Sequence, residues 1–381
     1  MTGKKGIYSW VTAFLYRGLS RGVMDALIEA GVSDFSRAAG RCIVREEKGG
    51  LLSLVPGRDL TEDPIDIISF MAEAKSAPSM LTLIIETGGL ATPGRGSVFC
   101  EEIRLLRSHE SFAPSDLKPP EEKEEKIEQI PLARTRMTGI CCIVQNGQGN
   151  RVGRIALDTG VCVPSIHLGY GTGVRDKMGL LRIAIPAEKE IITFISRAHD
   201  ADTVMELMIE AGKLDQPGKG FIFSFPLKQG LQNIKVSRGE RQHAASIDQI
   251  VAAIDGMKGG SEWRERTNIL TRNGIKKRSY LKGLADMTLI CDEGFSADLI
   301  KAAMSAGAGG ATVSRFKQSA GSESEQGRRA ASREMCSMAV SEASIPGIME
   351  ALEKAGAFSD ECRGQVFVRP IEKAFTYVRR K

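Results

Sequence analysis

The sequence predicts an α+β protein made of three ferredoxin-like (βαββαβ) domains in one chain, arranged as a pseudo-trimer. A repeated segment is the first observation behind this prediction, and its copies occupy 86–99, 210–223 and 354–367. In each copy a glycine ends a helical pattern, and a basic residue and a second glycine follow, as in Gly212, Lys219 and Gly220. The second observation is that the two helix-ending glycines of each copy are similarly spaced, at 31 and 88, 160 and 212, and 307 and 356. This regularity indicates a repeated domain.

The first repeat is predicted to cover 7–107, because short apolar runs and helical patterns follow each other there in the order β-α-β-β-α-β. A glycine ends each helical pattern, as is common at helix C-termini. Residues 46–62 are rich in glycine, glutamate and proline and are predicted to form a loop. The expected strands are 10–16, 41–45, 65–71 and 97–103, and the expected helices are 20–30 and 78–86.

The second repeat is predicted to cover 135–241, after a charged, proline-containing linker at 108–134. Its third strand is expected at 180–185, where apolar residues alternate with Arg182. About eight residues would then separate Gly171 from that strand, so no long loop is expected in this repeat. The other expected strands are 139–145, 166–168 and 221–227, and the expected helices are 152–158 and 201–211.

An insert at 242–280 separates the second repeat from the third, and helical spacing of its apolar residues predicts one amphipathic helix near 247–254. The third repeat is predicted to cover 281–381. Residues 317–333 are polar and glycine-containing and are expected to form a long loop. The expected strands are 284–291, 311–316, 335–340 and 365–371, and the expected helices are 296–306 and 346–355.

Composition excludes several classes of function. The net charge of +5 is mild and the chain has only two Trp and five Tyr, which does not favour nucleic-acid binding. Eight cysteines form no C-x-x-C pair and four histidines have no ligand spacing, so no metal is expected. No apolar stretch approaches the roughly 20 residues of a membrane helix, and a cytoplasmic protein is the expectation.

Enzymatic signatures are also missing from the sequence. It contains no recognisable pair of catalytic carboxylates and no Ser-His or Cys-His motif, so no catalytic residue is predicted. His167 lies beside a G-x-G sequence and is interpreted as a structural histidine. The chain is therefore expected not to be an enzyme.

Three motifs of the second repeat resemble those of the nitrogen-regulatory P-II signalling family. They are Gly169-Tyr170-Gly171-Thr172 after the second strand, the Gly218-Lys219-Gly220 turn, and Lys235-Val236-Ser237-Arg238 after the last strand. Members of this family have the β-α-β-β-α-β fold, form trimers and bind adenine nucleotides between subunits. The resemblance implies three tandem P-II-like domains, covers the chain mainly at the level of fold, and is most specific in the second repeat.

The resemblance implies a nucleotide site in an inter-domain cleft that involves the second repeat. Glycines there would let backbone N–H groups approach a phosphate, and the basic side chains would add charge. Arg41, Arg95 and Arg363 are weaker equivalents in the other repeats, which depart from the motifs. The implied nucleotide-binding residues are Gly169, Gly171, Thr172, Gly218, Lys219, Gly220, Lys235 and Arg238.

The function implied by the resemblance is that of a non-enzymatic regulatory or adaptor protein for signal transduction. It would bind ATP, ADP or AMP and dock on a target enzyme, transporter or regulator through the loops 46–62 and 317–333. Only Gln318 is a candidate for a 2-oxoglutarate site, in a poor context, so 2-oxoglutarate binding is not expected. A monomer is the expected form. The alternative is a structural subunit of a larger assembly that binds no ligand.

Overall fold

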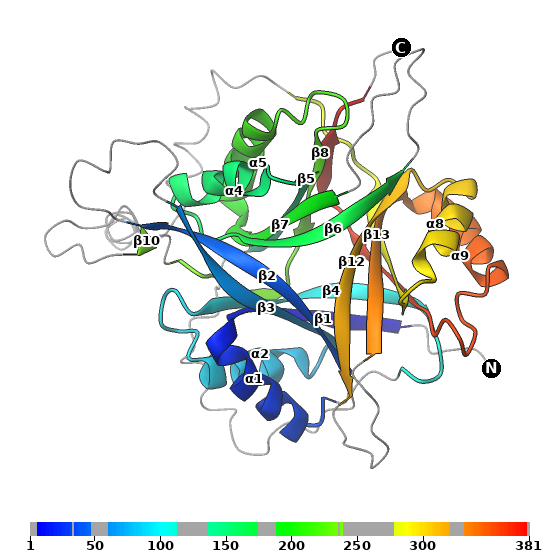
Figure 1. Cartoon of the computed structure of the whole chain (residues 1–381), viewed down its shortest axis with the longest axis horizontal. Coiled ribbons are helices and arrows are strands. Elements are labelled where there is room, and N and C mark those ends of the chain that lie inside the picture. The colour runs from blue at the N-terminus through cyan, green and yellow to red at the C-terminus, as the bar shows by residue number, and fades with distance from the viewer. Residues whose placement is uncertain are drawn as a thin grey trace, which may run out of the picture.

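A computed structural model of the chain describes residues 6–32, 34–46, 60–112, 136–173, 188–234, 237–238, 278–320 and 331–378. Strands contain more of these residues than helices do. The elements fall into three consecutive runs, which we call the first segment (6–112), the second segment (136–238) and the third segment (278–378). Each has a pair of helices on the outside of the molecule, and the strands of all three meet in the middle (Figure 1).

The order β-α-β-β-α-β occurs in each segment. The first segment contains β1 (Gly6–Tyr16), α1 (Arg17–Glu29), β2 (Asp34–Glu46), β3 (Leu60–Ala72), α2 (Ala77–Gly88) and β4 (Gly96–Ser108). The second contains β5 (Met137–Gln145), α4 (Gly149–Asp158), β6 (Ser165–Gly173), β7 (Glu188–Arg197), α5 (Ala198–Gly212), β8 (Gly220–Pro226), β9 (Gln229–Leu231) and β10 (Ser237–Arg238). The third contains β11 (Leu284–Asp292), α8 (Ser296–Ser305), β12 (Gly310–Ala320), β13 (Ala331–Ser341), η3 (Glu342–Ser344), α9 (Ile345–Lys354), β14 (Gln365–Pro370) and β15 (Lys373–Thr376).

The predicted fold class is wrong, because the described strands form one 15-stranded sheet rather than the separate sheets of three ferredoxin-like domains in a pseudo-trimer. Its strand order is β10-β2-β3-β1-β4-β14-β11-β13-β12-β6-β7-β5-β8-β15, and β9 pairs with β4. An isolated ferredoxin-like domain leaves its two outer strands unpaired, and such edges tend to recruit a partner. Here the outer strands of every segment are paired with strands of another segment.

Three joints connect the segments; the first–second joint contains three strand pairings, one of them the short β10–β2 pair, and the other two joints contain two each. The first–second joint also contains β2–β6 and β4–β9, and the second–third joint contains β12–β6 and β15–β8. The third–first joint contains β12–β2 and β14–β4. The first half of each of β2, β6 and β12 pairs with the second half of another of these three strands. The pairings therefore close into a ring around the centre of the molecule.

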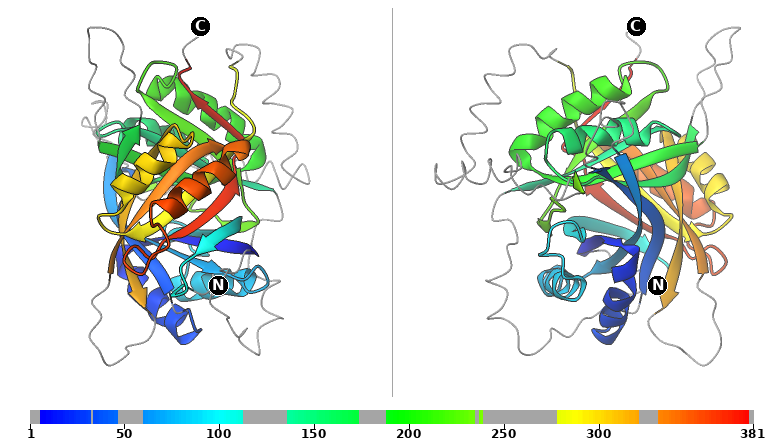
Figure 2. Two further views of the ribbon diagram at one scale, coloured as in Figure 1. Left: turned by 90° about the vertical axis from the view of Figure 1, so that its right-hand side faces the viewer. Right: turned by 60° about the vertical axis from the view of Figure 1, so that its left-hand side comes forward.

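Helices cover the outward faces of the strands. In the first segment α1 and α2 bury Val23, Leu27 and Ile84 against the sheet, and in the third α8 and α9 bury Leu299 and Ile348. Figure 2 shows α8 and α9 lying over the strands of their own segment. The largest apolar cluster belongs mainly to the second segment but also takes in side chains from the other two, among them Phe14, Ile65, Phe99, Ile371 and Ala374. The core is continuous across the joints, as the sheet is.

Several predicted boundaries are wrong because the strands are longer than their apolar runs. β2 continues to Glu46 and β3 begins at Leu60, so only 47–59 of the expected loop 46–62 connect them. β12 runs to Ala320 and β13 begins at Ala331, which shortens the expected loop 317–333 to 321–330. The third strand of the second segment is β7, which pairs with β5 along its length, and the connection before it is 174–187.

Other predictions fall outside the residues that the structure describes. These are the linker 108–134 beyond residue 112 and before 136, the amphipathic helix near 247–254, the expected strand 180–185, and most of the insert 242–280. Within the described ranges, no helix is long and apolar enough to cross a membrane.

Candidate functional site

A cavity of about 520 Å³ lies at the second–third joint. Its walls come from β5, β6, β7 and β8 of the second segment and from β11, β12, β13 and β15 of the third. The lining residues are Ile143, Gly171, Thr172, Lys189, Gly218, Gly220, Phe221, Leu281, Leu284, Gly309, Gly310, Ala311, Thr312, Ser337, Ala339 and Thr376. Residues from two segments are thus needed to form it.

A glycine turn and a lysine lie close together at one side of this cavity. The turn carries Gly218 and Gly220, and two side chains hold it: Gln145 donates from Nε2 to the Gly218 carbonyl (3.1 Å), and Thr376 donates from Oγ1 to the Gly220 carbonyl (2.8 Å). Lys189 pairs with Gln145 in the β5–β7 ladder. Burial lowers the pKa of Lys189, because desolvation disfavours the charged ammonium. A group that neutralises this charge would be stabilised there.

Apolar and hydroxyl side chains make up much of the remaining wall. Ile143, Phe221, Leu281, Leu284 and Ala339 supply apolar surface. Hydroxyl groups come from Thr172, Thr312, Ser337 and Thr376. A cavity of this size with apolar walls and a few convergent polar groups has the usual composition of a small-molecule site.

The corresponding position at the third–first joint is filled. The cavity there is only about 30 Å³ and is lined by Asp34, Phe35, Met71, Gln318, Arg333 and seven further residues from β1, β2, β3, β11, β12 and β14. The strand register shows which residues correspond. Arg333 pairs with the last residue of β11, Asp292, as Lys189 pairs with the last residue of β5.

Small residues create the larger cavity. At the second–third joint Gly171 pairs with Thr312. At the third–first joint the corresponding pair is Gln318 and Ser36, so Gln318 stands where Gly171 does. By the same alignment the small lining residues Gly310, Ala311 and Ala339 correspond to Asp34, Phe35 and Met71. Four positions that carry longer side chains at the third–first joint therefore carry glycine or alanine at the second–third joint.

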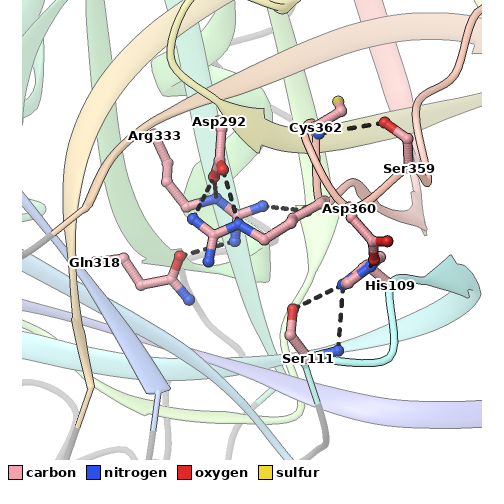
Figure 3. Close-up of polar contacts among 9 residues, drawn as sticks. His109, Ser111, Asp292, Gln318, Arg333, Ser359, Asp360 and Cys362 are labelled. Atoms are coloured by element: carbon pink, nitrogen blue, oxygen red, sulfur yellow. Dashed lines mark hydrogen bonds and ion pairs between the residues drawn. The ribbon is translucent and has the colours of Figure 1, made fainter. Parts of the chain in front are cut away.

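The third–first joint is closed by a network of charged side chains (Figure 3). The Arg333 guanidinium is 1% exposed; it donates to Gln318 Oε1 (2.8 Å), contacts Asp292 Oδ1 (3.2 Å) and lies 4.2 Å from the centre of the Phe112 ring. Arg363 donates to both oxygens of Asp292 (2.7 and 3.0 Å). Gln318 also donates to Asp34. His109, which follows β4, contacts Asp360, three residues before Arg363 in the chain (3.0 Å).

The charges at the two joints differ in a way that bears on the ligand. Arg333 faces Asp292 directly and feels the negative charge of Asp34. At the second–third joint the two corresponding positions are occupied by Gln145 and Gly310, which are uncharged. The second–third joint therefore keeps a positive side chain, Lys189, at the position of Arg333. The positions that match Asp292 and Asp34 carry no carboxylate there.

Four of the residues implied by the resemblance line the large cavity together: Gly171, Thr172, Gly218 and Gly220. Gly169 lies two residues before Gly171 in β6. A Cβ atom at Gly169 would lie 2.8 Å from the Val313 carbonyl oxygen, so this glycine permits the close approach of β6 and β12. Lys219 stands between two lining glycines but does not itself line the cavity.

Of the basic segment after β9, the described part lies away from this cavity. Lys235 lies outside the described residues, and Arg238 is in β10, which runs beside the end of β2 at the left of Figure 1. The cavity-lining strands β8 and β12 lie to the right of it in that view. The chain that covers the Gly218–Gly220 turn is the end of the third segment, since β15 pairs with β8.

The three weaker equivalents have structural partners. Arg41 donates to Glu190 Oε1 (2.6 Å) and to Asn150 Oδ1 (3.1 Å) across the first–second joint. Arg95 donates from Nε to the Gly88 carbonyl at the end of α2 (2.9 Å). Arg363 is held by Asp292 in the network described above. These arginines stabilise turns and joints.

Sequence reasoning missed Lys189 and all the third-segment residues of the cavity. Lys189 precedes the apolar run of β7 and belongs to no motif, and the small residues Gly310, Ala311 and Ala339 are significant only by comparison with another joint. His167 has a buried Nδ1 with no hydrogen-bond partner among the described atoms, and it is not part of the cavity. No group of three or more potential metal ligands occurs in the described part of the chain.

No protein-family model matches the chain, and a search of curated proteins finds no matching relative.

Proposed function

We propose that this chain is a non-enzymatic regulatory or adaptor protein that binds an adenine nucleotide in the cavity at the second–third joint. The observation that carries the proposal is the cavity itself, whose volume of about 520 Å³ lies within the range of about 300–1,000 Å³ usual for ligand pockets. Its position between two segments means that a ligand would contact both of them.

The charge pattern supports an anionic ligand. Lys189 lines the cavity, and the two positions that supply carboxylates at the third–first joint are Gln145 and Gly310 here. A phosphate group in the cavity would be attracted by the positive charge of Lys189. The glycine turn at Gly218 and Gly220 offers backbone close to the same place, as phosphate-binding turns do.

The uncharged walls support a nucleoside attached to that phosphate. Phe221, Leu281 and Leu284 provide apolar surface for a base, and Thr172, Thr312 and Ser337 provide hydroxyl groups for a ribose. The choice of adenine follows from the resemblance of the Gly169–Thr172 and Gly218–Gly220 motifs to the P-II family. Docking on a target protein through residues of the loops 46–62 and 317–333 belongs to the same proposal.

Isothermal titration calorimetry of the pure protein with ATP, ADP and AMP tests the proposal. At least one of the three is expected to bind with micromolar dissociation constant and a stoichiometry of one per chain. Absence of heat with all three, confirmed by an orthogonal thermal-shift measurement, would sink the nucleotide proposal.

The variant Lys189→Met is expected to weaken nucleotide binding by roughly 10- to 100-fold, because a charge-assisted hydrogen bond contributes about 1.5–3 kcal/mol. Lys301→Met is the matched control, since Lys301 is an exposed lysine on α8 and does not line the cavity. Equal affinity of both variants would show that the anion lies elsewhere.

A ligand-free structural subunit of a larger assembly is the second candidate. The filled third–first joint favours it, because one of the corresponding positions has become a purely structural contact. Purification from the native source distinguishes the two candidates. A structural subunit would co-purify with its partners at a fixed ratio that added nucleotide does not change.

A further inference from the structure

We infer that the ligand completes the second–third joint in place of side chains, so that occupancy of the cavity sets how firmly the third segment is held against the second. The inference rests on the proposed ligand site and adds a mechanical role to it. It is drawn from a comparison of the three joints, which share a strand register and differ in what fills them.

The first–second joint is filled by apolar side chains. Ile65 pairs with the last residue of β1 and so corresponds to Lys189, and Cys42, opposite Ser165, corresponds to Gly171. Ile195 takes the position of Ala339. These three residues and Phe14 are buried in one cluster that spans both segments. This joint needs no ligand, because its interior is already packed.

The third–first joint is filled by apolar side chains, among them Met71 and Phe316, and by charged ones. Arg333, Gln318 and Asp34 bridge the third and first segments in one connected network. A second charged contact lies across the same joint: Arg369 of β14 donates to Glu101 Oε1 of β4 (2.6 Å) and contacts Asp286 (2.7 Å). Side-chain contacts therefore connect the two segments at this joint without a ligand.

The second–third joint has strand pairing of similar length but an unfilled interior. β12 and β6 form four residue pairs, and β15 and β8 form four. Side-chain contacts across it include those of Tyr170 with Glu334 (2.9 Å) and Lys373 with Asp202, and the hydrogen bond from Thr376 to the Gly220 carbonyl beside the cavity (2.8 Å). A cavity of this size can hold water, which gives its two walls no direct contact with each other. A ligand in contact with both walls would link them.

Thermodynamic linkage then dictates the consequence. A ligand that touches Gly218 and Thr172 on one wall and Ala311 and Ala339 on the other binds only when the walls are together. Binding therefore favours the closed joint over any opened form, by an amount that grows with ligand concentration. The strand pairs nearest the cavity, at 310–313 and 373–376, should respond most.

Hydrogen exchange of the full-length protein, followed by mass spectrometry with and without saturating ATP, tests the inference; ADP or AMP replaces ATP if calorimetry selects it. Exchange at 310–313 and 373–376 is expected to slow by at least about tenfold with nucleotide, since opening the joint would require its release. Residues 65–71 of β3, remote from the cavity, serve as the internal reference.

Two filling variants supply the second arm. Ala339→Met and Ala311→Phe introduce the side chains found at the corresponding positions of the third–first joint, Met71 and Phe35. Each is expected to abolish nucleotide binding and to slow exchange at 310–313 and 373–376 without nucleotide. If wild-type protein binds nucleotide but exchange there slows no more than at 65–71, the mechanical role is wrong while the proposed site stands. If calorimetry detects no binding, the site and this inference fall together.

Discussion

At the scale of single residues, one register position decides the character of each joint. The position opposite the last residue of the first strand is Ile65, Lys189 or Arg333 in the three segments. Ile65 packs in the apolar core of the first–second joint, and Arg333 forms an ion pair at the third–first joint. Lys189 lines the cavity at the second–third joint. The long, planar guanidinium of Arg333 reaches three polar partners and an aromatic face at once, which an ammonium group cannot do.

Replacing Arg333 is therefore expected to weaken the whole molecule. Arg333→Met leaves the half-buried carboxylate of Asp292 with one partner fewer and should lower the free energy of unfolding by about 3 kcal/mol. Arg136→Met is the control, because Arg136 is largely exposed and its pair with Glu372 should contribute less than about 1 kcal/mol. Urea denaturation of both variants measures the difference, and similar losses would contradict the role given to Arg333.

His167 should make stability depend on pH. Burial lowers its pKa to about 4, below the ordinary value of about 6.5. Between these values the unfolded chain binds a proton that the folded chain does not, so stability falls as the pH drops from about 6.5 to about 4. His167→Gln should reduce that fall, which urea denaturation at pH 7 and pH 5 measures. An unchanged slope in His167→Gln would rule out this source of the dependence.

At the scale of elements, a collision explains the glycine shared by the repeated segments. Gly96 and Gly220 begin β4 and β8, and Gly364 directly precedes β14. A Cβ atom there would lie 2.3 Å from the Phe14 oxygen, 2.4 Å from the Ile143 oxygen or 2.0 Å from the Ala357 oxygen. The glycine is needed wherever the last strand begins against neighbouring backbone. Its recurrence therefore reflects the fold, and the second copy, Gly220, also lines the cavity of about 520 Å³.

Gly96→Ala should consequently destabilise the protein by about 2 kcal/mol or more, since its φ of +148° and the contact with the Phe14 oxygen both oppose a side chain. Gly22→Ala, in α1 with no atom near its added methyl group, should stabilise by up to about 1 kcal/mol. Thermal denaturation compares the two. A harmless Gly96→Ala would mean that the strand start can shift.

The elements themselves were largely predictable, because apolar periodicity and helix-ending glycines are local signals. The error at β7 shows the limit of such signals. Residues 180–185 alternate as a strand does, but the stretch that buries Ile192, Phe194 and Ile195 and pairs with β5 begins at Glu188. In the candidate site, Gly171, Thr172, Gly218 and Gly220 were predictable from motifs. Lys189 and Ala339 were not, because their role depends on residues far away in the sequence.

At the scale of the whole molecule, continuity of the sheet should make unfolding cooperative. Opening any one segment breaks strand pairs with both others. All eight cysteines are free and buried, and they are distributed over the three segments, so they report on each. Alkylation along a urea gradient, read by mass spectrometry, is expected to show one midpoint for Cys42, Cys162 and Cys291. Distinct midpoints for the segments would mean that they unfold independently.

Ring closure of β2, β6 and β12 also bears on how the chain can be divided. A fragment consisting of the third segment alone would present the edges of β12 and β14, which in the intact chain pair with β6, β2 and β4. Unsatisfied edges of this kind recruit further copies. Such a fragment is expected to be isolated as an oligomer or an aggregate, and adding the missing two segments as a separate polypeptide should restore a soluble, split form of the protein.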